Sequence, residues 1–115
     1  MERNVECNFN MLIVHMKDWD GASPPFDELV RSALMQAMLL GRGERFMSTL
    51  TSKTEVGGTS FARYALGVSR PRPAMMRLII REMREVLIAT REQVTRDHNA
   101  MVMLGRHMGN CGPDD

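Results

Sequence analysis

The apolar residues in the last third of the chain recur with a helical period, and no other feature restricts the fold as much. A seven-residue spacing returns side chains to one face of a helix. Five residues follow this spacing: Ile80, Leu87, Val94, Met101 and Met108. Leu104 lies on the adjoining row. The pattern predicts a helix from Pro73 to Thr90, which extends to Met108 unless the polar stretch 90–99 breaks it.

This apolar row can act in two ways. It can pack on the core of its own domain, or it can pair with the same row of a second copy, and we expect a homodimer. Met101 and Met108 belong to the row, and Met76 and Met83 lie on the adjoining one. Because methionine adapts to many surfaces, a different protein partner is also compatible with the pattern.

A second helix is predicted between residues 24 and 40. Ser23 can cap it, and Pro24 and Pro25 fit a first turn, where a missing N–H group has no cost. Its apolar residues recur at spacings of three and four, as in a helix with one buried face. Gly41 is expected to end it, since glycine readily adopts the left-handed conformation of a helix C-terminus.

The remaining segments are compatible with strand or helix. In residues 5–19 the pattern fits both, and the β-branched pair Ile13 and Val14 favours a short strand. Residues 42–69 form either helices or a β-hairpin with strands near 45–52 and 60–68. We therefore expect a mainly α fold with minor β content in one domain, residues 1–108, followed by a disordered tail over 109–115. The alternative is an α+β fold with a central β-hairpin.

The charge is distributed unevenly along the chain. The whole chain carries a net charge of +1. Residues 1–41 carry −3, residues 42–84 carry +6 and residues 85–115 carry −2, and most of the thirteen arginines lie in the central block. A concentrated positive block favours a phosphate-bearing or acidic partner.

The central block contains a possible helix–turn–helix. In the stretch Leu66-Gly67-Val68-Ser69, Gly67 can supply the positive φ of a turn, Val68 can fill the space between two helices, and Ser69 can cap the second helix. The stretch resembles the helix-turn-helix regulators of bacteria, phages and plasmids over about twenty residues. The resemblance implies a helix-turn-helix-like centre ahead of the long C-terminal helix.

The resemblance also implies a DNA-contacting unit over residues 59–84. Its second helix, residues 70–84, would enter the major groove, where Arg70 and Arg72 would contact base edges. Other residues of the unit would contact phosphates or support the turn, namely Arg63, Ser69, Arg77, Arg81 and Arg84. Met76, Ile79, Ile80 and Met83 would face the body of the domain. We expect a small DNA-binding regulatory protein, of the kind found as phage or plasmid transcriptional regulators, with double-stranded DNA as its partner.

Other classes have less support. The alternative is a non-enzymatic protein-interaction module, such as an adaptor, inhibitor or chaperone with a Met-rich helical surface, and RNA binding by the same basic block is a third. The sequence has no phosphate-binding glycine motif and no convincing set of metal ligands. We expect no catalytic residues, no cofactor and no metal. No apolar run is long enough for a signal peptide or a membrane span, so we expect a cytoplasmic protein without membrane contacts.

Overall fold

The computed structural model describes residues 2–110, with side chains over residues 8–105. Within this range the regular structure is helical: α1 (Glu2–Lys17), α2 (Phe26–Leu39), α3 (Gly43–Thr54), α4 (Gly58–Ala65) and α5 (Pro73–Asn110). The described residues form no strand, so the expected minor β content and the hairpin alternative are both wrong. Residues 109 and 110 of the expected tail end α5, and residues 111–115 lie outside the described range.

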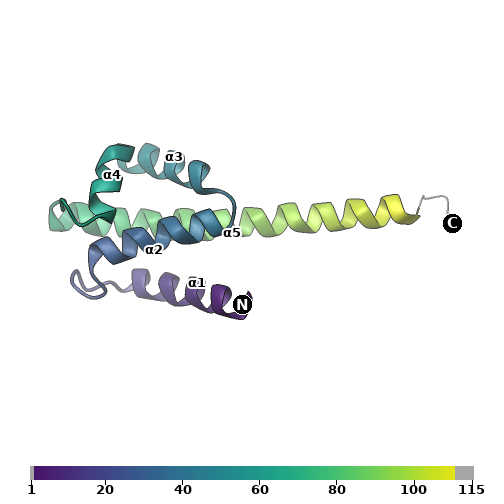
Figure 1. Ribbon diagram of the computed structural model, residues 1–115, viewed down its shortest axis with the longest axis horizontal. Coiled ribbons are helices and arrows are strands. Elements are labelled where there is room, and N and C mark those ends of the chain that lie inside the picture. Colours follow the sequence, from purple (N-terminus) through teal and green to yellow (C-terminus); the bar gives the residue numbers. More distant parts are fainter. Residues whose placement is uncertain (1, 111–115) are drawn as a thin grey trace.

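Helix α5 is the axis of the molecule. At about 1.5 Å per residue its 38 residues span about 57 Å, which is most of the 62 Å longest dimension. Helices α1, α2 and α3 pack on its N-terminal half, and α4 packs on α2. The rest of α5 projects from this body as a single helix (Figure 1). The polar stretch 90–99 does not break it.

The core lies where α5 meets the other helices. Met76, Ile79, Ile80 and Met83 are buried, as the sequence predicts, and Leu87 is buried with them. They pack with the large buried side chains of the shorter helices, namely Phe9, Leu29, Phe46, Leu50 and Phe61. The body of the domain is therefore built around one half of α5.

Helix α1 replaces the predicted strand. Phe9, Leu12 and Met16 recur at helical spacing and are buried, and α1 packs on α5. Arg91 of α5 holds this contact, because its guanidinium carbon lies 4.6 Å from the centre of the Phe9 ring and Nη1 donates to Asn10 Oδ1 at 2.9 Å. The apolar face that α5 offers overrides the local preference of Ile13 and Val14 for a strand.

Helix α2 begins later than predicted. Ser23 does not cap it: Pro25 occupies the N-cap position, and no side chain makes a cap hydrogen bond. The peptide bond between Ser23 and Pro24 is cis. The end is as predicted, because Gly41 has a φ of +73°. The Gly41 N–H donates to the Met38 carbonyl, and the Arg42 N–H donates to the Ala37 carbonyl. These two bonds form a Schellman motif.

Residues 42–69 form helices α3 and α4 instead of a hairpin. The threonines of this segment have a high strand propensity, but two of their hydroxyls bond within α3. Thr51 Oγ1 donates to the Ser48 carbonyl, and Thr54 Oγ1 donates to the Leu50 carbonyl. Burial of Phe46, Leu50 and Phe61 then fixes both helices on the body.

Candidate nucleic-acid interface

The turn around Gly67 has the predicted conformation. Gly67 has a φ of +73°, its N–H donates to the Tyr64 carbonyl at 3.1 Å, and the Val68 N–H donates to the Arg63 carbonyl at 3.0 Å. This is a second Schellman motif, and it ends α4. The backbone at Gly67 turns because a glycine tolerates a positive φ without steric cost.

The residues after the turn do not have their predicted roles. Val68 is 63% exposed and fills no space between helices. Ser69 does not cap α5, which begins at Pro73. The connection over residues 66–72 is longer than the three or four residues of a helix-turn-helix turn.

Helix α4 is held by α2 rather than by α5. Arg31 Nη1 donates to the Ala65 carbonyl at 2.7 Å and to Asp27 Oδ2 at 2.9 Å. The hydrogen bond from Arg31 lowers the pKa of the Asp27 carboxyl. The Tyr64 ring packs edge-on against Phe26, with 5.8 Å between the ring centres. Helix α4 is thus positioned mainly through α2, which also packs on α5.

Three of the predicted arginines converge on one hollow. Arg77, Arg81 and Arg84 of α5 line it together with Lys17, the last residue of α1, and Trp19 of the following loop. Met16 and Ile80 complete its wall, and its volume is about 250 Å³. We call this site the basic hollow. Four cations and no carboxylate line it, so the arrangement attracts anions.

Hydrogen bonds hold two side chains of the basic hollow, those of Arg84 and Trp19. Arg84 Nε donates to the Ile13 carbonyl at 3.3 Å, which ties α5 to α1. Trp19 Nε1 donates to the Pro24 carbonyl at 2.8 Å, so the indole is fixed beside the cations. Arg77 runs against the loop before α2, because a Cβ atom at Gly21 would lie 3.4 Å from Arg77 Nη2. Arg84 and Trp19 are therefore fixed where α1 meets α5, whereas Lys17, Arg77 and Arg81 are exposed to solvent.

Asp20 of the loop and Glu82 of α5 are two acidic groups near the hollow, and Glu82 pairs with Arg81 of the hollow itself. Asp20 accepts hydrogen bonds from the N–H groups of Ser23 and Ala22 at 2.8 Å, and these bonds lower the pKa of its carboxyl. Glu82 lies 3.6 Å from Arg81 and 3.9 Å from Lys53 of α3. Arg81 remains largely exposed and available to a further anion.

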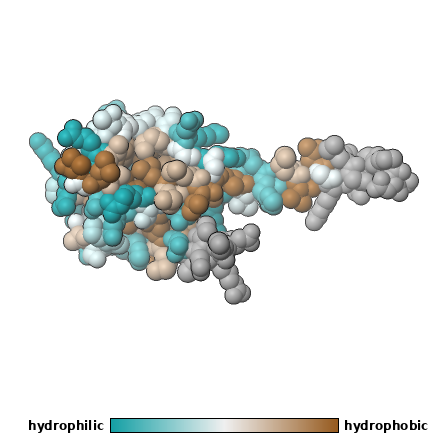
Figure 2. Space-filling model, in the orientation of Figure 1, coloured by the Kyte–Doolittle hydropathy of each residue, from teal (hydrophilic) through white to brown (hydrophobic). Residues whose placement is uncertain are grey.

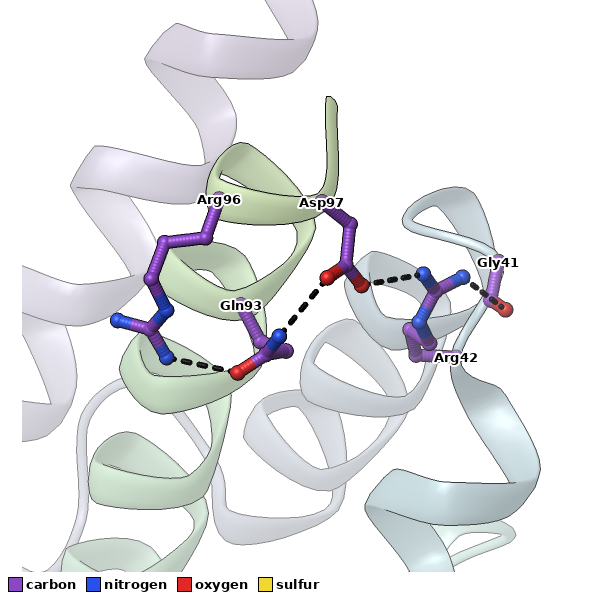
Figure 3. A network of polar contacts seen from close by, with 5 residues as sticks. All are labelled: Gly41, Arg42, Gln93, Arg96 and Asp97. Carbon is purple, nitrogen blue, oxygen red and sulfur yellow. Dashed lines mark hydrogen bonds and ion pairs between the residues drawn. The ribbon is translucent and has the colours of Figure 1, made fainter. Parts of the chain in front are cut away.

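A second group of cations lies between α3 and α5, and carboxylates compensate part of its charge. Arg42, Arg45, Lys53 and Arg96 line a hollow of about 250 Å³, but Glu85 lines it as well. Asp97 Oδ2 accepts from Arg42 Nη2 at 3.2 Å, and Gln93 joins Asp97 to Arg96 (Figure 3). Hydrogen bonds from Gln93 and then from Arg42 lower the pKa of Asp97. This compensated hollow attracts an anion less than the basic hollow does.

The other predicted DNA-contacting residues lie outside the basic hollow. Arg63 is exposed in the last turn of α4, and Arg70 and Arg72 are exposed in the connection that leads into α5. Ser69 is half-buried in the same connection. Sequence reasoning missed Lys17 and Trp19, and a helical assignment for residues 2–17 would have placed both at the end of a helix.

The predicted dimer row is divided between two environments. Ile80 and Leu87 are buried in the core of their own chain, so they cannot belong to a dimer contact. Val94 is half-buried, and Met101 and Leu104 are exposed. The side chain of Met108 lies outside the described residues. The free part of the row is therefore confined to the projecting end of α5.

No protein-family model, no curated protein and no solved structure matches the chain. Among the described residues, no helix is both long and apolar enough to cross a membrane, and no three potential metal ligands of the His, Cys, Asp or Glu type come together. The function is therefore argued from the geometry of the chain.

Proposed function

We propose that the protein is a small regulatory protein that binds double-stranded DNA, as phage and plasmid transcriptional regulators do. The observation that carries this proposal is the basic hollow, where Lys17, Arg77, Arg81 and Arg84 surround Trp19 without a carboxylate in the wall. Arginine and lysine side chains supply most contacts to DNA phosphates. Arg84 and Trp19 are already held by hydrogen bonds, so these two side chains would lose little entropy when a phosphate binds.

The exposed arginines next to the hollow extend this surface. Arg77 and Arg81 are one turn apart on α5, and Arg70 and Arg72 immediately precede that helix. Phosphate contacts from the helix would fix the register, and Arg70 and Arg72 would then reach base edges through their paired N–H donors. Arg63 and Ser69 complete the proposed contact set. A homodimer formed through the projecting end of α5 would present two such surfaces to one duplex.

The test is equilibrium binding to a DNA duplex, followed by fluorescence anisotropy at several salt concentrations. The variant Arg77→Ala/Arg81→Ala should lose roughly tenfold or more in affinity, and the slope of log affinity against log salt should fall by about two. The matched control, Arg45→Ala/Arg96→Ala, removes the same charge from the compensated hollow and should keep most of the affinity.

Two results would contradict the proposal. One is an absence of DNA binding by the unmodified protein at low salt. The other is an equal loss of affinity in both double variants, because that would reflect total charge alone. Tighter binding to an RNA hairpin than to the DNA duplex would indicate that the site recognises RNA by its shape.

A second candidate function is a protein-interaction module, and one observation favours it. The projecting end of α5 exposes Met101, Val102 and Met103 to solvent, and methionine-rich surfaces adapt to varied partners. A protein that forms no DNA complex at low salt, yet binds another chain through this segment, would be of this class.

A further inference from the structure

The basic hollow has an apolar part as well as its cations. Met16 and Ile80 belong to its wall, and because they are only 3% and 2% exposed, they form its floor. Trp19 lines the hollow too and is half-buried, so part of its indole is open to a ligand. Arg77 and Arg81 line the same hollow and are exposed. The site therefore combines an apolar floor and an aromatic wall with a cationic rim.

The basic hollow lies in the body of the molecule. Figure 2 shows apolar surface on the projecting helix, toward the other end of α5. The hollow uses residues 77–84 of α5, and the exposed apolar residues are 101–104, so the two regions are about 30 Å apart along the helix. A contact through the projecting end therefore leaves the hollow open to a ligand.

A phosphate group alone does not fill the basic hollow. The volume of about 250 Å³ corresponds to about eight water molecules at about 30 Å³ each, which is much more than one phosphate occupies. A phosphate is also polar on every side, and a polar group that is buried against apolar atoms without a hydrogen bond loses free energy. A ligand that fits has an anionic group for the rim and a flat apolar part for the floor and the indole.

The indole and one cation belong to the same side of the hollow. Trp19 Nε1 donates to the Pro24 carbonyl at 2.8 Å, and this bond sets the orientation of the ring. Gly21 lies in the same loop, and a Cβ atom there would be 3.4 Å from Arg77 Nη2. The Arg77 guanidinium therefore packs against the loop that carries the indole, so a group stacked on Trp19 has a cation close by.

Arg84 supplies a second cation, deeper in the hollow. It is half-buried, and its Nε donates to the Ile13 carbonyl at 3.3 Å. Among the described residues its guanidinium has no other hydrogen-bond partner, so both Nη groups remain for a ligand. A pair of such groups can donate to two oxygens of one phosphate.

A nucleotide has both of the parts that the hollow requires. Its base has a flat face that stacks on an aromatic side chain, and its phosphate is an anion that guanidinium groups bind. In a duplex the bases stack on each other and cannot reach a side chain in this way, whereas an unpaired base can. The hollow therefore fits an unpaired nucleotide better than it fits the backbone of an intact duplex.

We propose that the basic hollow holds an unpaired nucleotide of DNA, with its base stacked on Trp19 and its phosphate bound by Arg77 and Arg84. The inference rests on the part of the proposed function that makes DNA the partner of this site. Arg70 and Arg72 are exposed outside the hollow, just before α5, and remain available for an adjoining duplex. The preferred DNA is then a duplex that continues as a single strand.

The carboxylates near the hollow leave this contact open. Asp18 and Asp20 flank the tryptophan in the chain, but neither lines the hollow, and Asp20 accepts two backbone hydrogen bonds. Glu82 lies 3.6 Å from Arg81 and compensates part of its charge. Among the described residues, the two arginines assigned to the phosphate make no ion pair of this kind.

Three DNA probes with the same duplex test the inference on the full chain. The first is blunt, the second continues on one strand as about six unpaired thymidines, and the third has an overhang of the same length without bases. The two overhangs carry the same phosphates, so they differ only in what can stack. Fluorescence anisotropy should show that the thymidine overhang binds about tenfold tighter than the abasic one.

The emission of the protein reports on the same site, because the chain has one tryptophan. A base stacked on Trp19 should quench its emission. The thymidine overhang should therefore quench it strongly, whereas the abasic overhang, the blunt duplex and inorganic phosphate should leave it nearly unchanged. Equal quenching by the thymidine and abasic overhangs would overturn the inference.

Two variants separate stacking from a merely structural role of Trp19. Trp19→Leu removes the ring and should reduce the advantage of the thymidine overhang over the abasic one to less than twofold. Trp19→Phe keeps a ring but loses the hydrogen bond to the Pro24 carbonyl, and it should keep most of the advantage. Circular dichroism verifies that both variants are folded. An equal loss in both would mean that Trp19 only positions the loop, and the inference would be wrong.

Failure of this inference is distinguishable from failure of the proposed function. Equal affinity of the unmodified protein for the two overhangs overturns the inference, needs no variant, and leaves duplex binding and its loss in Arg77→Ala/Arg81→Ala unaffected. Binding of a free thymidine strand without binding of any duplex supports the unpaired nucleotide and contradicts the proposed function. Tighter binding of an RNA overhang than of the DNA overhang would overturn the choice of DNA.

Discussion

At the scale of single residues, the connection between α4 and α5 depends on Gly67. Its positive φ lets two backbone N–H groups bond back to the carbonyls of Arg63 and Tyr64. A side chain at this position would have room, since a Cβ atom would lie 3.5 Å from Asp27 Oδ2. The backbone conformation therefore requires glycine at this position, and side-chain packing contributes little to the requirement.

Gly67→Ala tests this conformational demand. An L-residue in the left-handed region costs about 1–2 kcal/mol, so the free energy of unfolding, measured in urea, should fall by about that amount. The matched control is Gly58→Ala, because Gly58 lies in α4 without a positive φ and with open space around its Cβ position. Gly58→Ala should leave stability unchanged or slightly higher. Equal destabilisation by both changes would mean that the turn does not depend on the positive φ.

At the scale of the elements, α1 exists because α5 offers it a surface. Its 16 residues are near the length at which an isolated helix is only marginal in water. Phe9, Leu12 and Met16 lie on one side and are buried, whereas Met11 and Val14 on the other side are exposed. A strand in the same segment would have placed Phe9, Met11 and Ile13 together on its buried face.

A pair of alanine substitutions separates the two interpretations of α1. Leu12 is 6% exposed, and Leu12→Ala should lower the free energy of unfolding by about 2–5 kcal/mol. Met11 is 51% exposed, and Met11→Ala should change it by no more than about 0.5 kcal/mol. Urea denaturation measures both variants. A larger loss of stability from Met11→Ala than from Leu12→Ala would support a strand in this segment instead of α1.

The elements that the sequence predicted correctly are those with local signals. Gly41 and Gly67 mark turns through their own backbone, and the period of residues 73–108 is long enough to indicate a helix by itself. Helices α1, α3 and α4 carry weaker patterns, and their threonines and β-branched residues favour strands until tertiary contacts form. The candidate site was predicted in part for the same reason. Arg77, Arg81 and Arg84 share one face of a predicted helix, whereas Lys17 joins them only through the packing of α1 on α5.

At the scale of the whole molecule, α5 joins two regions with different roles. Its first half carries the core and the basic hollow, and its projecting half carries the exposed apolar run. The net charge of +1 conceals this organisation. Next to α3, Glu85 and Asp97 compensate some of the charge of the central positive block, whereas the wall of the basic hollow beside α1 contains no carboxylate. Positive potential is thus concentrated at the basic hollow.

The homodimer of the proposed function would determine the length of DNA that one molecule covers. A duplex of about 30 base pairs, about 100 Å long, has room for the basic hollows of both copies, whereas one of about 10 base pairs, about 34 Å long, has room for one. Because the salt dependence of binding counts phosphate contacts, the slope for a dimeric protein should be about twice as steep on the longer duplex. Met101→Lys places a charge on the exposed apolar end of α5 and, as a monomer, should give the shallower slope on both duplexes. Met11→Lys adds the same charge at an exposed position of α1 and should behave like the unmodified protein. Anisotropy titrations at a series of salt concentrations measure these slopes, and equal slopes for the unmodified protein on the two duplexes would separate DNA binding from dimerisation.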